Sequence, residues 1–305
     1  MISPAGGVFS GSTSVTLSTT TPGATILYTT DGTSWETYEP PLTITPTVTL
    51  RAKAVRDGYA DSGIATATFL SEGDAVPAIV GQASDPAQPS HLTLWLRADA
   101  GISTNVGDRV DVWLDQSGHG NNATQSLGTA VPNQVTMADQ LNGLPALHFD
   151  GNDSLQFANR LTDIRTVFWV IREDPNAGNG ARFLLGENST GGTYDFFGGY
   201  NHQIWNGNTS ANIRNGQTWV NGQPVDGTVT NRPTAMSVVS VVTTDVVHAA
   251  NFSQDRGMAS GYWQGDLAEL IVFNVPLSSK ITNNPEDDAK WLAIETYLKR
   301  KYGIQ

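Results

Sequence analysis

Apolar and polar residues alternate along several short segments at the start of the chain, at residues 15–17, 25–29, 48–55 and 65–69. Alternation with a period of two is typical of strands that bury only one face. Turn sequences separate these segments, namely TPG (21–23), DG (31–32) and RDG (56–58). The pattern predicts a small β-sandwich over residues 1–70.

The alternation is lost between residues 71 and 90, where three Pro and two Gly stand among small polar residues. This composition indicates a linker. Strand-like runs then return from His91 onward, at residues 92–98, 109–115, 146–150, 166–173, 182–187, 235–244 and 266–274. They predict a second and larger β-sandwich over residues 91–305.

One helix is predicted near the C-terminus, over about residues 285–301. Asn284 is a good N-cap, and Pro285 suits the first helical position. Basic residues fill the last turn before Gly303, which favours the end of a helix. A single apolar stripe contains Trp291, Ile294 and Leu298. We therefore expect the helix to pack against the second sandwich as a brace or a lid.

The first 70 residues resemble a known domain family. The segments that carry the likeness are ISPAGGVFSG, ATILYTTDGTSW and VTLRAKAVRDGYADSG. They are similar to the fibronectin-III-associated domain, also called the chitobiase/β-hexosaminidase C-terminal-type domain. Trp35 and Glu36 depart from this family, in which a Pro-Thr pair is common at that place. The resemblance implies an accessory sandwich of secreted glycan-processing proteins, more often a spacer than a catalyst.

The second sandwich also resembles a family, from about residue 92 to the C-terminus. The segments are, in order, LWLRADAG, VWLDQSGHGNNATQ, LNGLPALHFDGNDSL, WQGDLAELIVFN and ETYLKRKYG. They look like the bacterial laminin-G-like jelly roll of the concanavalin A-like superfamily. The resemblance implies two antiparallel sheets with a concave face, which is often a carbohydrate-binding surface. The expected class is all-β, with an immunoglobulin- or fibronectin-like sandwich followed by a jelly roll and a C-terminal helix.

Composition narrows the possible partners and the compartment. The net charge is −12 and no Lys/Arg cluster exists, which disfavours nucleic-acid binding. The absence of Cys excludes disulfides and thiolate chemistry. A cysteine-free chain rich in Thr and Asn suits a secreted or cell-surface bacterial protein. No apolar run is long enough for membrane insertion, and the start lacks a leader pattern. We therefore expect a fragment of a larger multidomain protein.

The stretch WLDQSGHGNNATQ places Asp115, Ser117 and His119 at a spacing of two. Catalytic triads draw their members from distant segments so that the side chains meet. The Gly and Asn residues around these three are typical of turns. We interpret the stretch as a structural loop in which Asp115 accepts bonds from backbone N–H groups.

The rest of the sequence contains no complete catalytic motif. The E-x-D-x-E strand of concanavalin-like hydrolases is absent, and Asp266 and Glu269 are three apart, which places them on opposite faces of a strand. A polysaccharide lyase needs a Tyr or His base beside neutralising polar groups. His202 and Tyr194, with Arg182 and Arg214 nearby in sequence, offer such a set. Catalysis therefore stays open, with a non-catalytic role favoured.

Calcium is the metal that the sequence favours. The five His residues form no metal-ligand spacing. Asp150 and Asp153 flank Asn152 in a turn, and Asp266 follows a Gly in the last strand-like run. These oxygen donors predict a structural calcium site at Asp150, Asp153 and Asp266, although a plain Asx turn explains the cluster equally well. No other cofactor is required.

Aromatic residues within a Gly- and Asn-rich stretch, residues 191–222, suggest sugar binding. Sugars stack an apolar ring face on an aromatic side chain, while polar groups bond the hydroxyls. Tyr200 and Trp205 are the strongest candidates, whereas Trp219 and Trp263 also suit the core of the sandwich. The predicted ligand-binding residues are Tyr194, Tyr200, His202, Trp205, Asn206, Arg214, Trp219, Asp255, Arg256, Tyr262 and Trp263.

Three functions remain open at this point. The favoured one is a non-catalytic carbohydrate-binding protein that recognises a polysaccharide in support of a glycan-degrading enzyme. The alternative is a jelly-roll lyase or glycoside hydrolase with an unrecognised site around His202 and Tyr194. The third is an adhesive or architectural surface domain with a protein partner, which predicts an exposed apolar patch.

Overall fold

The computed structural model describes residues 1–4, 7–9, 11–30, 34–45, 48–71, 91–104, 109–125, 135–140, 144–187, 194–256 and 260–305. The chain divides into two compact units, Met1–Gln82 and Ala83–Gln305. Strands dominate both units, and the only long helix of the described ranges is C-terminal, which confirms the predicted all-β class. Apart from Ser71, the predicted linker 71–90 lies outside the described residues. None of the described helices has the length and hydropathy needed to span a bilayer.

The first unit is a sandwich of two sheets. One sheet has the order β1-β3-β6 and the other β2-β8-β7-β4-β5. Val15, Leu50 and Phe69 are buried in the core between them. The alternating segments 25–29 and 48–55 coincide with β4 and β7. The strands are β1 Ile2–Ser3, β2 Gly7–Phe9, β3 Thr13–Leu17, β4 Thr25–Thr29, β5 Glu36–Thr37, β6 Leu42–Ile44, β7 Val48–Val55 and β8 Ala65–Ser71.

The second unit is built on an 11-stranded sheet. Its main path is β10-β11-β12-β15-β20-β18-β19, and β15 also pairs with β21, which leads to β9, β14 and β13. Two further short strands, β16 and β17, pair with each other. The strands are β9 Leu92–Arg97, β10 Ile102–Thr104, β11 Val110–Trp113, β12 Ala123–Gln125, β13 Val135–Gln140, β14 Leu144–Asp150, β15 Leu155–Glu173, β16 Arg182–Phe183, β17 Phe197–Gly198, β18 Gln217–Val220, β19 Gln223–Val225, β20 Ser237–Phe252 and β21 Gln264–Phe273. The helices are α2 Ala211–Arg214, α3 Ser279–Thr282 and α4 Pro285–Tyr302.

Strands β15 and β20 are much longer than the predicted runs 166–173 and 235–244. Their pairing shifts register three times between Gln156 and Thr166. Each shift changes which side chains face the core, so the period of two is interrupted along the sequence. The predicted strand 182–187 is shorter in the structure, where only Arg182–Phe183 pairs as a strand.

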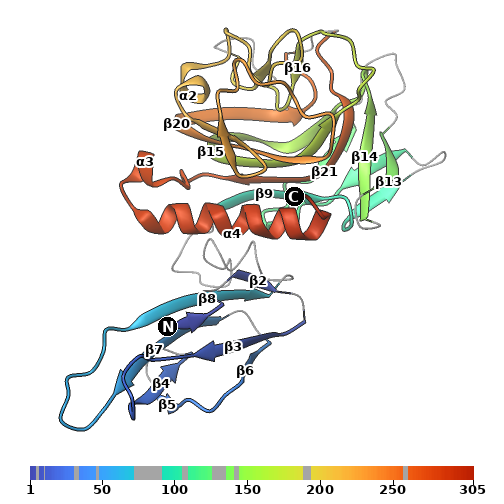
Figure 1. Ribbon diagram of the computed structural model, residues 1–305. Helices are drawn as coiled ribbons and strands as arrows, with labels where there is room; N and C mark the ends of the chain where they lie inside the picture. Colours follow the sequence, from blue (N-terminus) through green and yellow to red (C-terminus); the bar gives the residue numbers. More distant parts are fainter. Residues whose placement is uncertain are drawn as a thin grey trace. The chain divides into compact units, whose positions relative to one another are not determined.

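Different elements pack against the two faces of the central strands β15 and β21. Trp169 and Leu270 belong to the main core, which lies beneath the segment that contains β16, β17 and α2. The neighbouring side chains Phe168 and Glu269 face the opposite way and contact α4. Figure 1 shows α4 along one side of β9 and β21, with α2 and β16 beyond β15 and β20. The apolar stripe predicted for the helix is buried, as expected of a brace.

Candidate functional site

Three aromatic side chains lie together beside the β16–β17 pair, and we call Tyr194, Phe197 and Tyr200 the aromatic cluster. The ring centroids of Tyr194 and Phe197 are 5.1 Å apart. Tyr200 meets Phe197 edge-on at 6.5 Å and 77°, and it is 59% exposed. Phe183 supports the cluster from below, because its buried ring stacks on Phe197 at 4.9 Å and 17°. The result is an aromatic surface with a fixed base and an exposed edge.

Local backbone pairing explains why the rings meet. Phe183 and Phe197 are direct partners in the β16–β17 register, so their side chains share one face. Phe196 points the other way and is buried in the main core. Gly261, at φ 88°, lies so close to the Phe183 ring that a Cβ there would be 2.8 Å from it. A glycine is therefore needed at this approach.

Arg256 covers one ring of the cluster. Its guanidinium carbon is 4.3 Å from the centroid of Tyr194, a cation–π contact. Its Nε atom is 2.9 Å from Oδ1 of Asp255. Burial raises the pKa of the Asp255 carboxyl to about 6, against the opposing effects of a backbone hydrogen bond from Glu187 and the charge of Arg256. Asp255 is itself buried and serves Arg256 and the Glu187 backbone rather than a ligand.

Tyr200 stands on a tight turn formed by residues 199–203. The Gly199 N–H donates to the Gln203 carbonyl at 2.8 Å and closes the turn. Asn201 and His202 have φ angles of 54° and 66°, a left-handed conformation that is uncommon in L-residues and is stabilised here by the surroundings. Those surroundings include Arg232, whose Nη1 donates to the carbonyls of Gly199 and Gln203 at 2.8 and 2.6 Å.

The prediction that Trp205 presents its ring to a ligand is wrong. The residue is 1% exposed, and its indole N–H donates to the Thr218 hydroxyl at 2.9 Å. Its ring packs near Trp169 and Phe196 in the main core. The Gly- and Asn-rich segment folds back over the sheet and uses this tryptophan to fill the core, although the surrounding sequence is polar.

Two other tryptophans are also removed from the site. Trp263 is fully buried beside Phe252, as the core alternative held. Trp219 lies on the α4 side of the sheet, where its ring is 4.7 Å from that of Trp291. Because side chains alternate along β18, Thr218 faces Trp205 while Trp219 faces the opposite way. Neither ring is available beside Tyr200.

The side chains of the remaining predicted residues bond groups outside the aromatic cluster, although the Asn206 N–H donates to the Phe197 carbonyl at 2.8 Å. Asn206 accepts a bond from the Asn208 N–H and so stabilises its own turn. Arg214 donates from Nε to the Thr209 carbonyl at 2.7 Å, and Thr209 bridges to Tyr194. The Tyr262 hydroxyl accepts a bond from the Gln254 side chain at 2.8 Å.

The three carboxylates predicted to bind calcium, those of Asp150, Asp153 and Asp266, do not form a set of metal ligands. Both oxygens of Asp266 are engaged, one by His148 Nδ1 at 2.8 Å and the other by Arg172 Nε. Asp153 is fully buried and accepts the Asp150 N–H at 2.9 Å. The Asp150 carboxylate in turn accepts the N–H of Asn152, so the Asx-turn alternative is confirmed. In the described ranges no three His, Asp or Glu side chains are grouped as metal ligands, and these donors do not fit calcium.

The loop after β11 is structural, as predicted. Oδ1 of Asp115 accepts the N–H groups of Trp95 and Ser117 at 3.0 and 2.9 Å. Oδ2 accepts the N–H of Asn121 and the hydroxyl of Ser117 at 2.9 and 2.7 Å. In the part of the chain that the structure describes, no His side chain is hydrogen-bonded to a hydroxyl group. A Ser-His-acid relay is therefore not assembled there.

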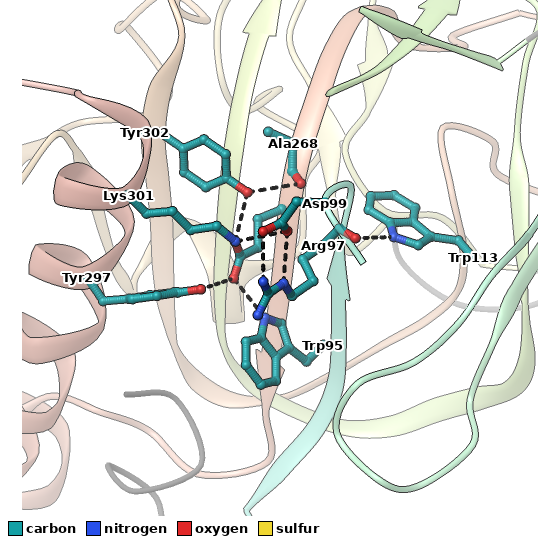
Figure 2. Close-up of polar contacts among 9 residues, drawn as sticks. Trp95, Arg97, Asp99, Trp113, Ala268, Tyr297, Lys301 and Tyr302 are labelled. Atoms are coloured by element: carbon teal, nitrogen blue, oxygen red, sulfur yellow. Dashed lines mark hydrogen bonds and ion pairs between the residues drawn. The ribbon is translucent and has the colours of Figure 1, made fainter. Parts of the chain in front are cut away.

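A polar cluster, separate from the aromatic cluster, joins α4 to the sheet, and Figure 2 shows its members. Glu269 is fully buried at its centre. One oxygen accepts the Trp95 indole N–H at 2.7 Å, and the other accepts Lys301 Nζ at 2.7 Å and the Tyr302 hydroxyl at 2.9 Å. Lys301 also reaches Asp99 at 3.0 Å. Because these groups bond one another beneath the helix, we interpret this cluster as an anchor for α4.

The sequence alone did not indicate four residues of the candidate site, namely Phe183, Phe197, Arg232, and Glu173, whose buried carboxylate accepts a bond from Arg232 Nε at 2.9 Å. The adjacent pair Phe196-Phe197 carried a signal, because only one of two neighbours on a strand can face the core. Glu173 and Arg232 carried none, since they meet across 59 residues of sequence.

Comparisons with known proteins bear on the first unit. Residues 4–66 match the model of the family described as the chitobiase/beta-hexosaminidase C-terminal domain. The family resemblance predicted for the first unit is thus supported over these residues. No curated protein matches the chain.

Solved structures add a distant likeness. The chain is similar to Trypanosoma rangeli sialidase in complex with sialic acid, with 14% identity and a TM-score of 0.38. The aligned part covers 82% of this chain and 43% of the sialidase chain. The same sialidase with 2,3-difluorosialic acid gives 12% identity, a TM-score of 0.38, and coverages of 83% and 43%. This chain therefore spans less than half the length of the sialidase chain in both complexes.

Proposed function

We propose that the protein recognises a polysaccharide without cleaving it, and that the aromatic cluster is the glycan-binding surface. The observation that carries this proposal is the exposed ring of Tyr200, held edge-on against Phe197 over the buried Phe183. Ring-stacking surfaces gain affinity from rings that are already ordered, because little side-chain entropy is lost on binding. The carbohydrate-related family of the first unit also supports it.

The finer assignments belong to the same proposal. The second unit is a laminin-G-like jelly roll of the concanavalin A-like kind, and the protein is secreted or displayed at a bacterial surface. The segments quoted for that family and the cysteine-free, polar composition support these two assignments.

Titration calorimetry and affinity gels with a panel of soluble plant, algal and microbial polysaccharides test the binding. Tyr200→Ala should weaken the Kd for a bound polysaccharide about tenfold, the effect of losing about 1.4 kcal/mol. Tyr59→Ala is the matched control, since Tyr59 is 64% exposed, close to the 59% of Tyr200. It belongs to the other unit, and its loss should leave the Kd within twofold of wild type, a limit well below that energy.

Two results would contradict the proposal. One is a wild-type protein that no polysaccharide on the panel retains. The other is release of reducing ends or unsaturated products by the wild type, lost in His202→Ala, which would favour the enzymatic alternative.

A further inference from the structure

The imidazole of His202 has one ring nitrogen committed to the protein interior. The side chain is 35% exposed, and its Nδ1 atom lies 2.8 Å from Oε2 of Glu173. Glu173 is fully buried, and its other oxygen accepts a bond from Nε of Arg232 at 2.9 Å. A carboxylate that is paired with arginine is ionised and only accepts hydrogen bonds. The proton of the His202–Glu173 bond therefore resides on Nδ1.

That proton decides what the exposed side of the ring can do. In a neutral imidazole with its proton on Nδ1, the Nε2 atom is a hydrogen-bond acceptor. Within the described ranges, no protein donor is bonded to Nε2 of His202. The charges of Glu173 and Arg232 cancel, so the three side chains together are neutral when His202 is neutral. A neutral acceptor suits a hydroxyl group and repels the lone pairs of a carboxylate or sulfate.

The same arginine also fixes the backbone that carries His202. Arg232 is 3% exposed and bonds the carbonyls of Gly199 and Gln203, the two ends of the Tyr200 turn. Its backbone N–H donates to the His202 carbonyl at 2.6 Å. His202 is thus held in a left-handed conformation, two residues from Tyr200 on one tight turn. The buried Glu173–Arg232 pair therefore fixes both the ring and the backbone of His202.

We infer that Glu173 and Arg232 are positioning residues of the glycan site, which set Nε2 of His202 to accept a hydroxyl of an uncharged sugar stacked on Tyr200. This inference rests on the proposed function and adds the ligand class, a neutral polysaccharide. Arg232 holds the turn, Glu173 selects the tautomer, and His202 contacts the ligand.

Nitrogen NMR tests the tautomer without any ligand. In ¹⁵N-labelled protein at about pH 8, where imidazoles are ordinarily neutral, long-range ¹H–¹⁵N correlations distinguish the two ring nitrogens. The expected result is a protonated Nδ1 for His202. The exposed His119, whose ring has no hydrogen bond to any residue of the described ranges, serves as the internal reference. A proton on Nε2 of His202 would overturn the inference, and the Glu173→Gln variant should lose the preference for Nδ1.

Binding tests the contact with two glycine variants of the same turn. Glycine accepts a φ of 66° without strain, so His202→Gly removes the ring and keeps the backbone. The affinity for a neutral polysaccharide, such as xyloglucan or mixed-linkage β-glucan, should fall about tenfold. Asn201→Gly is the matched control, because Asn201 has a φ of 54° and the change leaves the ring intact. It should change the affinity less than about twofold.

The charge of the ligand separates failure of this inference from failure of the proposed function. Wild-type protein should bind the neutral polymers at least about tenfold more tightly than carboxymethyl cellulose or polygalacturonate. A preference for the charged polymers, or an unchanged Kd in His202→Gly, would overturn the inference and leave the proposed function standing if Tyr200→Ala still loses binding. A wild type that binds neither kind of polymer would overturn both.

Arg232→Lys provides the test of the positioning role. Lysine keeps the charge but cannot reach the carboxylate and two carbonyls together. Hydrogen exchange should show faster exchange of the Gly199 and Gln203 amides, with protection in β15 and β21 unchanged. Unchanged exchange in the turn would contradict the role assigned to Arg232. If this variant does not fold, the tautomer of the wild type still decides the outcome.

Discussion

Replacing Lys301 with Met should detach much of the polar anchor beneath α4. The Lys301 ammonium is within 2.7 Å of Oε2 of Glu269 and 3.0 Å of Oδ1 of Asp99. Its side chain is 7% exposed, and Glu269 is fully buried. Methionine keeps the apolar stem beside Tyr302 but removes the charge, so the Glu269 carboxylate loses the one ion pair that it makes with the described residues.

The cost follows from the burial. Removing one partner of a buried ion pair destabilises a protein by about 3–5 kcal/mol, because the other charge stays buried. Glu269 keeps hydrogen bonds from Trp95, Tyr297 and Tyr302, so the low end applies, about 3 kcal/mol. At 2–4 °C per kcal/mol for a unit of this size, the Tm should fall by about 6–12 °C.

Urea unfolding, followed by tryptophan fluorescence and near-ultraviolet circular dichroism, measures the change in unfolding free energy. Lys290→Met is the control, because Lys290 pairs with Asp287 at 3.2 Å on the same helix but is 38% exposed. It should cost less than about 0.5 kcal/mol. A loss below about 1 kcal/mol in Lys301→Met, or equal losses in both variants, would refute the view that this cluster holds α4 through a buried charge.

Three further changes test single groups. Burial raises the pKa of Glu295 to about 7, against the charge of Lys299, and neither carboxylate oxygen has a hydrogen-bond partner among the described residues. Its ionisation therefore lowers stability as pH rises from 4.5 to 7. Glu295→Gln should remove that slope and add about 3 kcal/mol of unfolding free energy above pH 7, which urea titrations across pH would show or exclude. Asp115→Ala should lower the unfolding free energy by about 3 kcal/mol, because it leaves three backbone N–H groups without their acceptor. Asp115→Asn keeps one side-chain oxygen and should cost clearly less. Equal losses in the two variants would mean that this oxygen acceptor is unimportant. The hydrogen bond to Asp266 raises the pKa of His148, so this pair stabilises the fold below about pH 6.5. The stabilisation is lost as the pH rises through the folded-state pKa. His148→Gln should therefore lower the Tm more at pH 5 than at pH 9, and the opposite order would contradict the pairing.

Most strands and the helix could be predicted because their signals are local. Residues 25–29 and 48–55 alternate without interruption, and the structure forms strands over those same residues. Asn284, Pro285 and Gly303 mark helix ends through backbone geometry alone, and α4 runs from Pro285 to Tyr302. The loop at Asp115 was predictable for the same reason, since its partners are mostly within six residues.

The proposed binding site could be predicted only in part. The Gly- and Asn-rich segment with aromatic residues contains the aromatic cluster, and Tyr194 and Tyr200 lie there together, with Arg256 in contact with Tyr194. Trp205 stands in the same segment and is buried. Local sequence does not distinguish a ring that faces solvent from one that fills a core, because that depends on what lies on the other side of the backbone.

The sequence by itself therefore determined the all-β class, the strands with unbroken alternation, the C-terminal helix and the carbohydrate-related first unit. Only the tertiary structure decided which aromatic rings are exposed, and it alone brought Glu173 and Arg232 under the turn of Tyr200 and His202. The physical reason is range: backbone propensity and periodicity act between neighbours, whereas burial and charge pairing depend on segments that meet only when the sheet has formed.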